Sequence, residues 1–127
     1  MIYGYTKELA LPFTDAIARV RGALEAAGFG IPVEMNAQEI LKKKIDKDIE
    51  PYYILGACHP SSAYQAIQAE VEIGLLLPCN VLLYEKNRKV FVSMTLPTVA
   101  MQMVDNSVVA SIAQEVEEKL KGVLDRL

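Results

Sequence analysis

The sequence contains no tryptophan, one histidine and two cysteines among its 127 residues. Structural zinc sites usually have four ligands. Two thiols and one imidazole therefore give only weak support to a bound metal. The chain also lacks an excess of basic residues, because 13 Lys and Arg stand against 16 Asp and Glu, for a net charge of −3. A general nucleic-acid-binding surface needs surplus positive charge, and no nucleic-acid partner is therefore expected.

No apolar stretch has the length of a membrane span. The longest, from Ile73 to Tyr84, is broken by Pro78 and Asn80 and is shorter than the ~20 residues that a spanning helix needs. The first five residues lack the basic and apolar parts of a signal peptide. We therefore expect a cytoplasmic protein with no membrane partner, in which both cysteines stay reduced.

The composition that remains is typical of a folded, apolar-rich domain. Hydrophobic residues make up 52% of the chain and charged residues 23%. A length of 127 residues is close to the commonest domain size, which predicts a single domain over residues 1–127. A small domain with this much apolar surface often buries part of it against a second copy of itself, so we expect a homodimer.

The spacing of the apolar residues predicts strands and helices in a mixed order. Strands are expected at residues 2–9, 31–35, 52–57, 79–85 and 90–96, with the last two in a hairpin and strand 52–57 buried on both faces. Helices are expected at 12–27, after a capping Asn36, at 60–70, and from Asn106 to the C-terminus. Neither a strict βαβ alternation nor a glycine-rich phosphate loop is present. This order predicts an α+β fold with two layers: a mainly antiparallel sheet of about five strands, with helices on one face and a long C-terminal helix.

Two local features refine the helices. Gly28 is expected to end the first helix in a Schellman turn, with Phe29 folding back on the last helical turn. In the helix that begins at Pro60, the apolar spacing places Ala63, Ala66 and Ile67 on the inward face.

Three segments of the chain are specific in combination. They are Gly-Phe-Gly at 28–30, Ile-Leu-Gly-Ala-Cys-His-Pro at 54–60 and Gly-Leu-Leu-Leu-Pro-Cys-Asn-Val at 74–81. On these segments the chain resembles the "domain of unknown function 302" family over nearly its whole length. The resemblance implies a compact bacterial or archaeal α+β domain whose sheet is backed by a long C-terminal helix, and it implies no established activity. The family's usual Cys-Asn-Pro is Cys58-His59-Pro60 here, so the resemblance supplies no role for His59.

Both cysteines and the only histidine lie in two short segments at the ends of expected strands. Pro60 suits the first helical turn, which places His59 near the N-cap and Cys58 just before it, where the helix dipole favours a thiolate. Cys79 is flanked by apolar residues, as is common for a buried free cysteine. If the sheet brings the two segments together, the candidate site consists of Cys58, His59, Cys79 and Asn80, with Asn80 able to orient the imidazole.

Three functions stay open at this point. The first is a binding or interaction domain, because no recognisable catalytic constellation is present and no enzyme class is assigned. The second is a thiol-dependent redox protein that uses Cys58 and Cys79, with His59 tuning their reactivity. The third is a soft-metal-binding protein that adds Met101 or Met103 to the same residues. The sequence leaves any cofactor and any small-molecule ligand unknown.

Overall fold

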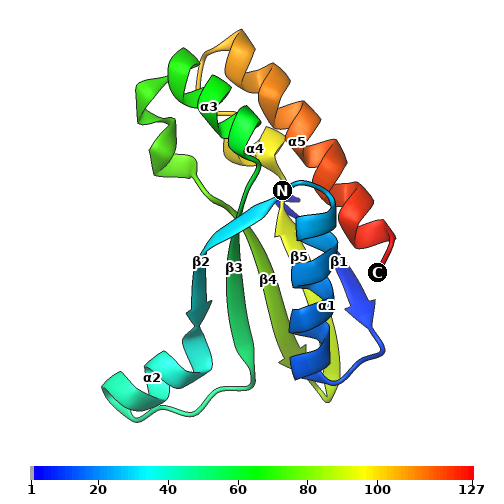
Figure 1. The fold of residues 1–127 in the computed structure, drawn as a ribbon. Coiled ribbons are helices and arrows are strands. Elements are labelled where there is room, and N and C mark those ends of the chain that lie inside the picture. Colours follow the sequence, from blue (N-terminus) through cyan, green and yellow to red (C-terminus); the bar gives the residue numbers. More distant parts are fainter. Residues whose placement is uncertain (1) are drawn as a thin grey trace.

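The computed structural model describes residues 2–127 and contains one five-stranded antiparallel sheet with helices packed on one face (Figure 1). The strands are β1 (Gly4–Leu9), β2 (Gly30–Asn36), β3 (Tyr52–Cys58), β4 (Cys79–Lys86) and β5 (Lys89–Thr95), in the order β1-β5-β4-β3-β2. The helices are α1 (Phe13–Ala26), α2 (Ala37–Ile45), α3 (Pro60–Ala69), α4 (Pro97–Ala100) and α5 (Ser107–Asp125), with a 3-10 segment η1 (Val71–Leu76) after α3. The expected α+β class, the five-stranded sheet and the long C-terminal helix are confirmed.

The core lies between the sheet and helices α1 and α5. Side chains alternate between the two faces of a strand, and every second residue of the central strands is buried on the helix side. The inward residues include Leu55 of β3, Val81 and Leu83 of β4, and Val92 and Met94 of β5. They pack in one cluster with buried residues of the two helices, among them Val20, Leu24, Val109, Leu120 and Leu124. No helix among residues 2–127 is long and apolar enough to cross a membrane.

The opposite face of the sheet stays open, which corrects one expectation. Strand 52–57 was predicted to be buried on both faces, but Tyr52 is 38% exposed and Ile54 is only half-buried. The reason is that the helices cover one side, so the alternate residues of β3 face the uncovered side (Figure 1). Gly56 is the exception, because Pro78 and Val33 lie directly over it.

The predicted helix ends are confirmed by their hydrogen bonds. Gly28 has a positive φ of 89°, and the Phe29 amide donates to the Leu24 carbonyl at 3.0 Å, as in a Schellman turn. Phe29 is thereby buried, with 3% of its surface exposed. The Asn36 side chain caps α2 by accepting from the Glu39 amide at 3.1 Å.

The C-terminal helix and the hairpin also follow their local signals. The Asn106 side chain accepts from the amides of Val108 and Val109, at 3.0 and 3.2 Å, and so begins α5 as predicted. Between β4 and β5, Asn87 and Arg88 both have positive φ, the backbone that a two-residue hairpin turn requires.

The inward face of α3 differs from the prediction. Ile67 was expected inside but is 44% exposed, whereas Ser62 and Ala66 are 6% and 2% exposed. Residues 62, 66 and 69 lie one helical turn apart, so they share the face that meets the core. Apolar spacing alone missed this face because its first member is a serine, whose hydroxyl oxygen lies 2.9 Å from the His59 Nδ1.

Candidate functional site

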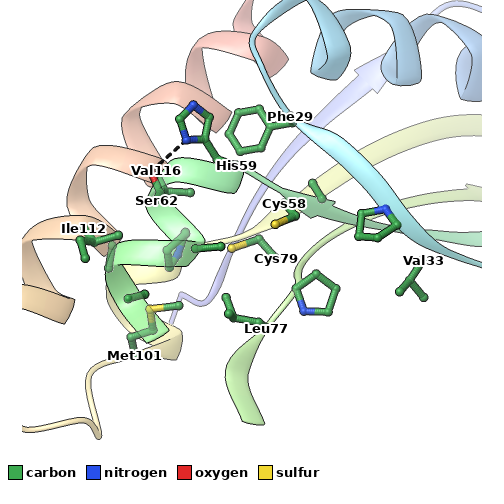
Figure 2. Close-up of a pocket in the computed structure, with 17 residues that line it drawn as sticks. Phe29, Val33, Cys58, His59, Ser62, Leu77, Cys79, Met101, Ile112 and Val116 are labelled. Carbon is green, nitrogen blue, oxygen red and sulfur yellow. Dashed lines mark hydrogen bonds between the residues drawn. The ribbon is translucent and has the colours of Figure 1, made fainter. Parts of the chain in front are cut away.

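A cavity of about 240 Å³ lies where the end of β3 and the start of β4 meet α3, α4, α5 and β2 (Figure 2). Its walls are mostly apolar, and they include Ala63 and Ala66 of α3, Ala113 and Val116 of α5, and Leu77 and Pro78 before β4. Three of the four candidate residues, Cys58, His59 and Cys79, also line it. Sheet pairing, helix start and helix packing thus bring both sulfur atoms and the only imidazole to one cavity.

The register of β3 and β4 brings both cysteines to the cavity. Ala57 lies opposite Cys79 in the ladder, and Cys58 is the next residue along β3. Both cysteines are free; Cys58 is half-buried and Cys79 is 7% exposed. Burial, and secondarily the charge of Cys58, raise the pKa of the Cys79 thiol to about 11. Cys79 is therefore a protonated wall group at neutral pH.

The imidazole of His59 is held between two hydrogen-bonding partners. His59 is the N-cap residue of α3, as expected, and its Nδ1 lies 2.9 Å from the Ser62 Oγ. Its Nε2 lies 3.4 Å from the Nζ of Lys119 on α5. An ammonium group can only donate, so Nε2 accepts from Lys119 and the Nδ1–H donates to Ser62. Both ring nitrogens are thus engaged, and neither is free to take a proton from a thiol.

The turn that ends α1 holds the imidazole from the other side. Phe29 packs edge-on against the His59 ring, with 5.4 Å between ring centroids. A Cβ at Gly28 would lie 3.5 Å from the His59 Nε2, and the positive φ of Gly28 also favours glycine. The Schellman turn predicted from the sequence therefore also positions a cavity residue.

Asn80 is the one candidate that does not line this cavity. It is exposed on the open face of the sheet, opposite Gly56 in the ladder, and lines a neighbouring hollow with Cys79 and Thr95. Ser62 and Lys119, not Asn80, contact the imidazole.

Comparison with known proteins agrees with the fold and the sequence motifs. The family described as "Domain of unknown function DUF302" matches residues 5–127. The chain belongs to the DUF302 family. A crystal structure of an uncharacterised conserved DUF302 protein from Bacillus stearothermophilus is similar, with 27% identity and a TM-score of 0.93, over 99% of this chain and 98% of that one. No curated protein matches.

In this DUF302 chain the described residues add no further metal ligands to those that the soft-metal hypothesis names. Met101 lines the cavity and is 7% exposed, whereas Met103 is 78% exposed. Among residues 2–127 no group of three or more His, Cys, Asp or Glu side chains could hold a metal ion. The nitrogens of His59 are bonded to Ser62 and Lys119, so the imidazole has no lone pair directed to the thiols.

Sequence reasoning missed two polar residues of the candidate site. Ser62 follows the N-cap His59 by three positions, the spacing at which side chains reach back to an N-cap residue, so this signal was available. Lys119 is 60 positions from His59 and lies near it only because α5 packs on α3. No local pattern indicates that contact.

Proposed function

We propose that this DUF302 domain binds a small apolar ligand in the cavity beside Cys58, His59 and Cys79. The observation that carries the proposal is the 240 Å³ cavity itself, with apolar walls and a few polar groups at one side. Sites for small molecules commonly have this composition. An apolar cavity of about 150 Å³ is known to bind benzene, so this one has room for a somewhat larger ring compound.

The state of Cys79 favours binding over redox chemistry. Thiol–disulfide exchange begins from a thiolate, and the two thiols of a redox pair must exchange protons and electrons with a partner. The pKa of about 11 leaves Cys79 protonated at neutral pH. Cys79 therefore acts as part of the apolar wall of the cavity, which supports ligand binding over redox chemistry.

The test uses α-methylstyrene, a compact apolar probe, and two alanine-to-leucine variants on α5. We expect the wild-type protein to bind the probe with a Kd on the order of 0.1–1 mM, followed by NMR chemical shifts. Ala113→Leu adds volume to the cavity wall and is expected to weaken binding at least tenfold. The matched control Ala110→Leu makes the same change on the exposed side of the same helix and is expected to bind normally.

Circular dichroism of both variants separates loss of binding from loss of folding, and Ala63→Leu on α3 offers a second way to fill the cavity. The proposal is contradicted if the wild-type protein shows no saturable shifts up to the solubility of the probe, or if Ala113→Leu and Ala110→Leu, both folded, bind equally.

We further propose that the domain pairs with a second copy through the open face of its sheet. Ile54, Leu82, Tyr84 and Phe91 are half-buried on this face, and the rings of Tyr84 and Phe91 stack with centroids 5.2 Å apart. In a two-fold dimer each residue near the axis meets its own copy, so a charge there would repel itself. The middle row of the face, which includes Ile54, Leu82 and Ser93, carries no charged residue, and this supports self-association.

Light scattering at ~10 µM protein tests the dimer. We expect the wild-type protein to have twice the mass of one chain, and Leu82→Glu to be a folded monomer because two buried carboxylates would face each other across the axis. The control Ile67→Glu changes an exposed apolar residue on α3, away from this face, and is expected to stay dimeric. A monomeric wild-type protein, or a dimeric Leu82→Glu, would refute the proposed interface.

A further inference from the structure

One polar side chain faces the cavity from a fully interior position. Ser62 lines the cavity from the first turn of α3 and is only 6% exposed. Within residues 2–127, His59 is the one hydrogen-bonding partner of its hydroxyl group (Figure 2). A hydroxyl has one donor hydrogen and can accept as well, so the direction of this bond decides what Ser62 offers to a ligand.

That direction is set from the protein surface. Glu115 lies 3.8 Å from the Lys119 ammonium and holds it on the exposed side of α5. Lys119 donates to the Nε2 of His59, which leaves the single ring hydrogen on Nδ1, and Nδ1–H donates to the Ser62 oxygen. Among residues 2–127 the O–H of Ser62 is then left without an acceptor. A buried donor of this kind is costly unless something pairs with it.

We infer that the ligand is a small, neutral, apolar molecule with one acceptor oxygen, such as a ketone or ester carbonyl, and that the Ser62 hydroxyl donates to it. This inference rests on the proposed function of the cavity and names the class of ligand. His59 and Lys119 act as positioning residues. They fix the direction of the Ser62 O–H but do not themselves bind the oxygen of the ligand.

A neutral ligand is favoured over a carboxylate by the charges around the cavity. None of the residues that line it is a lysine or an arginine. Lys119 lies beyond the imidazole and is paired with Glu115. A carboxylate would therefore lose its hydration with no cation in contact, which is unfavourable in an apolar site.

Three probes of nearly equal shape test this assignment: acetophenone with a carbonyl, α-methylstyrene with a methylene in its place, and benzoate with a carboxylate. The measured quantity is the Kd of α-methylstyrene divided by the Kd of acetophenone. In Ser62→Ala we expect this ratio to fall about fivefold relative to the wild-type protein, the usual effect of one lost hydrogen bond, with α-methylstyrene binding nearly unchanged. A purely structural role for Ser62 would weaken both probes equally and leave the ratio constant.

Changes at Lys119 test the direction of the hydrogen bonds without touching the cavity. Lys119→Met removes the donor to Nε2, so the imidazole can adopt the other tautomer and accept the Ser62 hydrogen. We expect the same ratio to fall about threefold in Lys119→Met, and to be retained in Lys119→Arg, which can also only donate.

The outcomes separate this inference from the proposal on which it rests. Binding of neither neutral probe would refute the cavity as a ligand site. Binding of both with an unchanged ratio in Ser62→Ala and Lys119→Met would overturn only the role of Ser62. Tighter binding of benzoate than of acetophenone would overturn the neutral class of ligand.

Discussion

Replacing Gly56 with alanine is expected to lower the free energy of unfolding by about 2–3 kcal/mol, as for other overpacked sites. A Cβ at this position would lie 2.6 Å from the Cγ of Pro78 and 3.2 Å from the Cβ of Val33. The proline ring is rigid and belongs to the segment that enters β4, so relief requires a shift of backbone beside the cavity. Urea unfolding of the wild-type protein and the variant measures the loss.

Gly22 provides a matched control for the same substitution. It lies inside α1, and an added Cβ there meets nothing within 4 Å. Gly22→Ala is therefore expected to raise the free energy of unfolding by about 0.5–1 kcal/mol, because alanine loses less backbone freedom in a helix than glycine. Equal effects of the two substitutions would show that contact with Pro78 does not decide the cost at Gly56.

Gly56 also marks the limit of what the sequence could predict about the sheet. The apolar run of β3 predicted the strand correctly, but the expected burial on both faces was wrong because the run cannot tell that helices cover only one face. Leu55 and Ala57 face the core, Ile54 faces the open side, and Gly56 is buried on that open side by Pro78. Burial on the second face thus depends on a proline 22 residues away (78 − 56), for which periodicity gives no signal.

Signals that act within a few residues were sufficient for the ends of the helices. Gly28 with Phe29, Asn36 with Glu39, and Asn106 each form the turn or cap that their residue types favour. Such contacts form within one turn of the chain, so the residue types at neighbouring positions are enough to predict them.

The candidate site could be predicted only in part, because only some of its contacts lie within a few residues of one another in the sequence. The placement of Cys58 and His59 before a helix that starts at Pro60 is local and was predicted. The polar contacts of His59 with Lys119 depend on how α5 packs against α3, and no local pattern encodes that packing. The expected inward position of Ile67 was wrong because apolar spacing gives no weight to a serine, and the residue that faces the core is the hydrogen-bonded Ser62.

Raising the pH from 9 to 11 is expected to destabilise the wild-type protein more than the Cys79→Ala variant, by about 2 kcal/mol in the free energy of unfolding. The pKa of the Cys79 thiol is raised from 9.0 to about 11, chiefly by burial and secondarily by the charge of Cys58. Well below pH 9 the thiol is protonated in both the folded and unfolded chains and contributes no pH dependence. Between pH 9 and 11 only the unfolded chain releases the proton, so stability falls as the pH rises through this window.

The comparison with Cys79→Ala isolates this thiol from other alkaline groups. The pKa values of Tyr5 and Tyr53 are also raised, by hydrogen bonds to Asp125 and Glu34. Their effects are present in both proteins and cancel in the difference. Urea unfolding at pH 8, 9, 10 and 11 measures the free energy of unfolding of both proteins. The packing that the variant loses lowers its free energy of unfolding by the same amount at every pH.

A Cys58→Ala variant then tests which cause dominates. Because burial is the larger cause, most of the alkaline loss is expected to remain when Cys58 is absent. If Cys79→Ala instead loses stability as steeply as the wild-type protein, the Cys79 thiol ionises about as readily in the folded chain as in the unfolded one. Water would then reach the wall of the cavity, and the site would favour reactive thiol chemistry over the binding of an apolar molecule.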